Sequence, residues 1–128
     1  MIFHQMNGAD LRFPSGTFDL VVTNNLLHEI GRENRRAMMR EARRVLASGG
    51  IVIHQDLPIR AAMSAVHQVE RGWDAKFNGE IFWNVYVEDD LVADMSAAGF
   101  MSSEITETYV EKVAGPGDWY LLAGEKCD

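Results

Sequence analysis

The sequence predicts an α/β fold with a mostly parallel sheet that ends in an antiparallel hairpin. Residues 18–23 and 51–55 are short apolar runs, typical of strands that are covered on both faces. Between them, residues 32–47 repeat apolar side chains at intervals of three and four, which predicts an amphipathic helix. A strand, a helix and a second strand in this order form one parallel crossover unit.

Two further features bound this central unit. Residues 2–6 are predicted to form a short first strand, which the turn dipeptide Asn7-Gly8 ends. Ser48-Gly49-Gly50 is predicted to stop the central helix, because glycine tolerates the left-handed conformation that commonly ends helices. The next strand would then begin at Ile51.

The C-terminal third predicts a helix followed by a hairpin. Glu88-Asp89-Asp90 supplies capping groups and negative charge at a helix start, and Gly99 is placed to end that helix. Residues 104–110 and 119–126 have strand patterns, and a Gly-Pro-Gly turn at 115–117 joins them.

Residues 57–87 do not follow from general fold rules. Ile59, Met63, Val66 and Trp73 keep a helical period, and a tract rich in aromatic residues follows them. This segment is either part of the core, which is the commoner role of an aromatic stripe, or a lid over a substrate.

Composition limits the possible functions. A chain of 128 residues fits a single domain over 1–128, and no apolar run is long enough to span a membrane. A net charge of −7 argues against nucleic acid as a partner. The single cysteine, Cys127, can form neither an internal disulfide nor a metal site by itself. We therefore expect a cytoplasmic protein.

Six arginines fall on the predicted helix at 32–47. They could form a phosphate-binding stripe or a solvated face opposite the apolar one, and we favour the solvated face. They are Arg32, Arg35, Arg36, Arg40, Arg43 and Arg44.

Three phrases of residues 11–56 carry a family resemblance. They are Leu-Arg-Phe-Pro-Ser-Gly-Thr-Phe-Asp at 11–19, Leu-His-Glu-Ile at 27–30 and Arg-Val-Leu-Ala-Ser-Gly-Gly at 44–50. In wording and spacing they resemble the middle of the class I S-adenosylmethionine-dependent methyltransferases. The resemblance implies a partial Rossmann-like methyltransferase fold, with 57–87 as an insertion or lid that can bring Trp83 and Tyr86 to the substrate.

The resemblance also implies a cofactor, S-adenosylmethionine. The family holds the adenine at the turn after its third strand, which matches Asn7, Gly8 and Ala9. It passes the methionine part of the cofactor at the end of its fourth strand, which matches Thr23, Asn24 and Leu26. From the residues alone, Asn7-Gly8 can equally be a simple turn.

Three polar side chains are candidates for chemistry. His28 matches the first histidine of the family's Leu-His-His-Leu phrase, and it could act as a base or only orient its loop. His54 and Asp56 lie two apart on a strand, so their side chains share a face. They could form a base with its orienting group, or two metal ligands. No third ligand has a recognisable spacing, so no metal is predicted.

The family's glycine-rich loop, which follows its first strand, has no counterpart here. The only Gly-x-Gly, at 115–117, lies in the predicted hairpin turn. The chain therefore resembles the C-terminal part of the family's domain. We expect a truncated methyltransferase that acts on a small-molecule acceptor, with weak or absent cofactor binding by this chain alone. The alternative is a non-catalytic domain of methyltransferase descent.

A sheet without its first two strands has an unpaired edge at residues 18–23. An exposed apolar edge strand is a template for pairing with another chain. The sequence therefore predicts a homodimer, formed across this edge or by exchange of residues 2–6.

Overall fold

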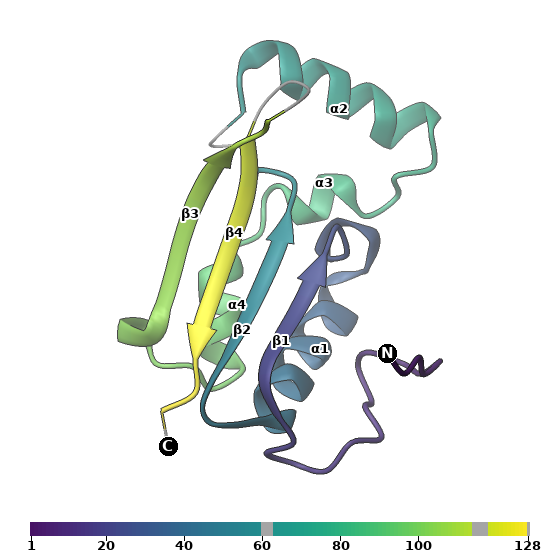
Figure 1. Cartoon of the computed structure of the whole chain (residues 1–128). Coiled ribbons are helices and arrows are strands. Elements are labelled where there is room, and N and C mark those ends of the chain that lie inside the picture. Colours follow the sequence, from purple (N-terminus) through teal and green to yellow (C-terminus); the bar gives the residue numbers. More distant parts are fainter. Residues whose placement is uncertain (60–62, 114–117, 128) are drawn as a thin grey trace.

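The computed structural model describes residues 1–59, 63–113 and 118–127, and a four-stranded sheet is its centre (Figure 1). The strand order is β1-β2-β4-β3. β1 is parallel to β2, while β4 is antiparallel to both of its neighbours, so only β4 runs against the other described strands. The predicted α/β fold with a closing antiparallel hairpin is confirmed. The strands are β1 Phe18–Asn24, β2 Leu46–Asp56, β3 Ile105–Glu111 and β4 Asp118–Glu125.

Helices α1 and α4 pack on one face of this sheet, and α2 extends from the end where β1 and β2 terminate (Figure 1). Among the described residues, no helix has the length and apolar character needed to cross a membrane. The helices are α1 Arg32–Val45, α2 Ala65–Phe77, α3 Trp83–Tyr86 and α4 Leu91–Ala97, and two 3-10 turns are η1 Leu27–Glu29 and η3 Ser102–Glu104.

The junction between α1 and β2 differs from the prediction. The helix ends at Val45 without a glycine cap, and Leu46 is already extended, with φ −67° and ψ 137°. The glycine pair therefore lies inside β2 instead of stopping α1. Gly49 has φ +73°, and its N–H donates to the carbonyl of Lys126. A side chain at Gly50 would come within 2.9 Å of the carbonyl oxygen of Ala47 in the same strand and 3.1 Å of that of Phe18 in β1, so lack of space explains this second glycine.

The predicted strand at residues 2–6 is wrong. These residues are irregular and almost wholly solvent-exposed, with Ile2 and Phe3 among the most exposed apolar side chains. A strand is stabilised by hydrogen bonds to a neighbour, and within the described residues β1 pairs with β2 alone. Without a neighbouring strand, apolar content is not sufficient to form one here.

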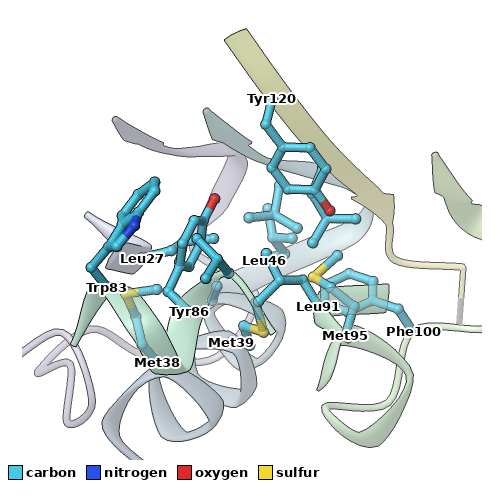
Figure 2. Packing of buried hydrophobic residues seen from close by; sticks show 14 residues of the cluster. Leu27, Met38, Met39, Leu46, Trp83, Tyr86, Leu91, Met95, Phe100 and Tyr120 are labelled. Carbon is cyan, nitrogen blue, oxygen red and sulfur yellow. The ribbon is translucent and has the colours of Figure 1, made fainter. Parts of the chain in front are cut away.

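The core lies between the sheet and the helices on its covered face (Figure 2). Tyr120 from β4 points into this layer, where Met39, Leu91 and Met95 of α1 and α4 meet it. The buried members of this core cluster among the described residues are Leu27, Met38, Met39, Ala42, Leu46, Val52, Trp83, Tyr86, Val87, Leu91, Met95, Phe100, Tyr120 and Leu122.

No described helix lies over the opposite face of the sheet (Figure 1), and apolar side chains of β1 and β2 are exposed to solvent. Leu20 and Val22 on β1 are 54% and 56% exposed, and Ile51 on β2 is 41% exposed. Leu20 pairs with Ile51 in register, so these side chains form one continuous patch. An exposed contiguous apolar patch indicates a surface that another element or chain can cover.

The arginines of α1 form the solvated face that the sequence favoured only in part, because Arg32, Arg36 and Arg40 are exposed while Arg35 is buried. Arg35 is fully buried and bonds to Asp89, and its Nε lies 3.6 Å from Asp94 in α4. Arg32 also bonds to Asp89, and Arg36 donates to Asp94 at 2.6 Å. Asp89, which the sequence assigned to a helix start, therefore also neutralises two arginines of another helix. Only Asp90 caps α4, through Ala93 N–H.

Arg44 fixes the N-terminal segment against α1. Its guanidinium donates to the carbonyls of Leu11 and Phe13, both at 2.8 Å. Glu41, which also bonds to Arg44, accepts the N–H of Leu11 at 2.8 Å. Residues 7–9 are consequently held beside α1 although they belong to no strand.

Helix α2 confirms a helix in the 57–87 segment, but its apolar side chains face solvent. Val66, Val69, Trp73 and Phe77 are all exposed, and the rings of Trp73 and Phe77 lie 4.2 Å apart. Ile59 and Met63, which were predicted to share this helix, precede it.

Candidate functional site

The loop after β1 and the end of β2 bring the polar candidates together. Because β1 and β2 are parallel, their carboxyl ends lie at the same edge of the sheet, where open α/β folds place ligands. Asn25 turns the chain there with φ 51°, and its N–H donates to Gln55 at 2.9 Å. The 3-10 turn η1 follows and carries His28 into the interior.

Asp56 organises this edge. Its fully buried carboxylate accepts the N–H of Leu27 at 2.6 Å and that of Leu57 at 2.7 Å. It also lies 2.5 Å from Nδ1 of His28. Because a carboxylate only accepts, Nδ1 of His28 carries a proton. Nε2 of the same ring lies 3.4 Å from Oε1 of Glu29. The sequence placed Asp56 beside His54, but its imidazole partner is His28.

The pKa of His28 is set by opposing effects. Burial lowers it, but the hydrogen bond and charge of Asp56 together with the charges of Glu29 and Glu80 outweigh burial. The net pKa is raised above the usual 6.5. The rings of Trp83 and Tyr86 pack edge-to-face against the imidazole, with ring centroids 6.0 and 6.1 Å from its own.

His54 is a structural histidine. It is fully buried, and a 2.8 Å hydrogen bond joins its Nδ1 to the hydroxyl of Thr23 on the neighbouring strand. Burial lowers its pKa to about 4, so it is neutral at neutral pH. Within the described residues its Nε2 has no hydrogen-bond partner. Thr23 and His54, for which the sequence proposed separate roles, are therefore hydrogen-bonded to each other.

A small pocket of about 120 Å³ gathers four of the six predicted cofactor residues. Asn7 forms its own turn here, since its Oδ1 accepts the N–H of Ala9 at 3.0 Å. The turn interpretation and the binding interpretation of Asn7-Gly8 are thus compatible. The lining residues are Asn7, Gly8, Ala9, Leu26, Ile30, Asn34 and Met38.

The structure does not bring Thr23 and Asn24 to this pocket. Thr23 bonds to His54 as described, and Asn24 ends β1 with its side chain exposed. Trp83 and Tyr86 belong to the core (Figure 2). The Tyr86 hydroxyl donates to the carbonyl of Leu57 at 2.5 Å. A substrate role for these two aromatic residues stays a prediction.

Sequence reasoning missed three lining residues and the partner of His28. Asn34 and Met38 are four residues apart on one face of α1, and Ile30 lies four residues before Asn34, just ahead of the helix. That spacing was a usable signal. The pairing of His28 with Asp56 had none, because the two residues lie on different elements.

A larger cleft of about 620 Å³ lies between α2, the start of α4 and β3. Four acidic residues line it: Glu88, Asp89, Asp90 and Glu107. Asp89 is occupied by arginines and Asp90 by the α4 cap, so two of these carboxylates already have structural partners.

A sequence model of the "Methyltransferase domain" family matches residues 1–54. The resemblance to the class I S-adenosylmethionine-dependent methyltransferases is confirmed. That match includes the lining residues of the small pocket, His28 and β1. A search of curated protein sequences finds no match for this chain.

Solved structures show the same methyltransferase fold over nearly the whole chain. A methyltransferase from Thermotoga maritima, described as a possible histamine N-methyltransferase, has a TM-score of 0.66 at 17% identity, covering 93% of this chain and 61% of its own. A Methanosarcina mazei methyltransferase gives 0.65 at 16% identity, covering 95% and 65%. The Burkholderia thailandensis 1,6-didemethyltoxoflavin-N1-methyltransferase, with S-adenosylhomocysteine bound, gives 0.61 at 11%, covering 94% and 48%. This methyltransferase-like chain spans about half to two thirds of their lengths.

The depressed pKa of His54 predicts acid sensitivity. In the unfolded chain this imidazole protonates near its usual 6.5, whereas the folded protein resists protonation until about 4. As pH falls through this window the unfolded state binds more protons, so the folded state loses about 3 kcal/mol from this group. His54→Asn removes the titration, so its unfolding free energy should fall less between these pH values, as urea titrations would measure. Equal pH slopes for the two proteins would contradict this role.

Proposed function

We propose that this chain supplies the adenine side of an S-adenosylmethionine site and the acceptor-side histidine of a methyltransferase acting on small molecules. The observation that carries this proposal is one juxtaposition. Leu26 lines the small pocket, and His28, two residues later, is locked by Asp56. The match to the methyltransferase family supports the proposal, because the matched residues 1–54 include the pocket residues and His28 and extend into β2.

The pocket suits a flat, mostly apolar group with polar edges. Leu26, Ile30 and Met38 supply apolar surface, while Asn7 and Asn34 supply amide groups able to accept or donate hydrogen bonds. Adenine has this character. Arg44 and Glu41, which tether Leu11, hold the Asn7 turn in place without entering the pocket.

His28 is proposed as the base. When bound, S-adenosylmethionine supplies an electrophilic methyl group on a positively charged sulfur, which leaves as a neutral thioether. The protein then needs to position the acceptor and receive its proton. Asp56 fixes the tautomer in which Nε2 of His28 has a free lone pair, so the proton of an acceptor hydroxyl or amine would pass to that atom. Acceptors that hold a proton therefore fit this site better than carboxylates.

Ligand binding tests the pocket. In this proposal the chain by itself contacts only the adenine side of the cofactor. We therefore expect adenosine and S-adenosylhomocysteine to bind with similar, millimolar affinity in saturation-transfer NMR. Asn34→Trp, a change on an exposed helix position that lines the pocket, should abolish both signals. Arg40→Trp on the same helix lies outside the pocket and serves as the control. Micromolar binding, or binding that survives Asn34→Trp, would refute the assignment.

Substitution of the histidine tests the chemistry. In any preparation in which this chain supports methyl transfer, His28→Gln should lower kcat by roughly 10²–10⁴, the usual contribution of a general base. Binding of S-adenosylhomocysteine should be unchanged, because His28 does not line the pocket. A variant with full kcat would show that His28 only orients its loop.

A second candidate function, a non-catalytic domain that assembles with another copy, is favoured by the uncovered sheet face. We propose a homodimer across the β1 edge, where Leu20 and Val22 are exposed. Val22→Glu should then yield monomers in light scattering after gel filtration. Val21 is a poor test position because it packs against the core. A wild-type protein that stays monomeric at high concentration would overturn the proposal.

A further inference from the structure

Three side chains with metal-binding atoms converge beside η1. His28 and Glu29 belong to η1, and Glu80 comes from the segment just before α3. One ligand atom from each residue lies within 4.8 Å of the other two. Glu80 is far from the other two residues in the sequence, so no spacing rule could reveal the group.

The closest pair already has the spacing that a metal requires. Zinc binds a histidine nitrogen at about 2.0–2.1 Å and a carboxylate oxygen at about 2.0–2.2 Å, so a tetrahedral angle separates the two ligand atoms by about 3.4 Å. Nε2 of His28 and Oε1 of Glu29 are 3.4 Å apart. The ligand atom of Glu80 lies within 4.8 Å of both, and rotation about its side-chain bonds can bring it closer.

The histidine is presented as metal-binding histidines are. Such residues usually donate the other ring N–H to a carboxylate, which fixes the tautomer and makes the ligating nitrogen more basic. Asp56 does this to Nδ1 of His28 at 2.5 Å, and the His28 side chain is only 8% exposed. Its orientation is therefore set before any ion binds.

The charges around Nε2 are unbalanced without a cation. Glu29 and Glu80 both face one imidazole, and Oε2 of Glu80 is buried with no hydrogen-bond partner within the described residues. A buried carboxylate oxygen without a partner is costly, and a bound cation would satisfy it. Glu29 is 55% exposed on its side chain, which leaves a path for an ion from solvent.

We propose that His28, Glu29 and Glu80 form a binding site for a divalent transition-metal ion, with Zn²⁺ the best fit. One imidazole with two carboxylates suits zinc, whereas magnesium and calcium prefer oxygen ligands alone. Three protein ligands leave a fourth position for water or a substrate atom.

This inference is independent of methyl transfer, because it concerns an ion bound without cofactor. It has one consequence for the proposed function. Zinc and an acceptor proton would compete for the same lone pair on Nε2 of His28, so the zinc-loaded protein could not use that nitrogen as a base.

Calorimetric titration with Zn²⁺ alone tests the site. We expect one ion per chain with a micromolar or tighter Kd, measured in a Cys127→Ser background because Cys127 is an exposed free thiol. Glu80→Gln and Glu29→Gln should each weaken binding by about tenfold or more, since losing even a supporting group commonly costs that much. Glu33→Gln, an exposed glutamate on α1 outside the group, should bind like the parent.

Thermal melts separate folding from binding. Zn²⁺ should raise the melting temperature of the parent and of Glu33→Gln, but not that of the two site variants. Glu29 is exposed, so its variant should fold even if Glu80→Gln does not. Absence of binding below millimolar Zn²⁺ would overturn the proposal. Tight binding that survives Glu29→Gln would also overturn it, because it would show an adventitious ion bound at other side chains.

Discussion

The fixed position of the Asp56 carboxylate is the constraint on which the candidate site depends. It joins the end of β2 to the loop that follows β1 through the N–H of Leu27 and Nδ1 of His28. A buried carboxylate is costly unless hydrogen bonds satisfy it. The two donors lie on the loop, so satisfying Asp56 fixes the position of the loop. The orientation of His28, the availability of its Nε2 and the approach of Glu29 all follow from this one group.

A second set of buried charges positions the helical layer. Arg35 is the largest fully buried side chain, and it lies between Asp89 and Asp94 at the start of α4. Breaking one partner of such a network is strongly destabilising, because the remaining charge stays buried. The network therefore fixes α1 against α4, and α1 in turn supplies Asn34 and Met38 to the small pocket. Stability and the site share one helix.

In the proposed function, the small pocket is the adenine side of the site and His28 is the acceptor side. The small pocket is built from the tethered N-terminal turn and α1, while His28 lies on the other side of Leu26 with Glu29 and Glu80 near it. Nε2 of His28 is the atom at which the acceptor chemistry and the metal inference meet. Its occupant, a proton or an ion, would decide whether it can act as a base.

The sequence by itself determined the order of the main helices and strands, and four of its six candidate cofactor residues line one pocket. Local patterns were sufficient for β1, α1, α4 and the hairpin strands, because periodicity and capping act over a few residues. The candidates Asn7, Gly8, Ala9 and Leu26 came from the family resemblance and not from local patterns. Residues 2–6 were predicted wrongly, since strand formation depends on a neighbour that no local pattern reports.

Only the tertiary structure decided which polar groups pair. His54 was expected near Asp56 but bonds to Thr23, while Asp56 bonds to His28 from another element. Arg35, expected in solvent, is buried against Asp89, which the sequence had assigned to the start of a helix. Each pairing joins residues at least 28 positions apart. Electrostatic partners are chosen by distance in the folded chain, which the backbone topology sets and the sequence spacing does not.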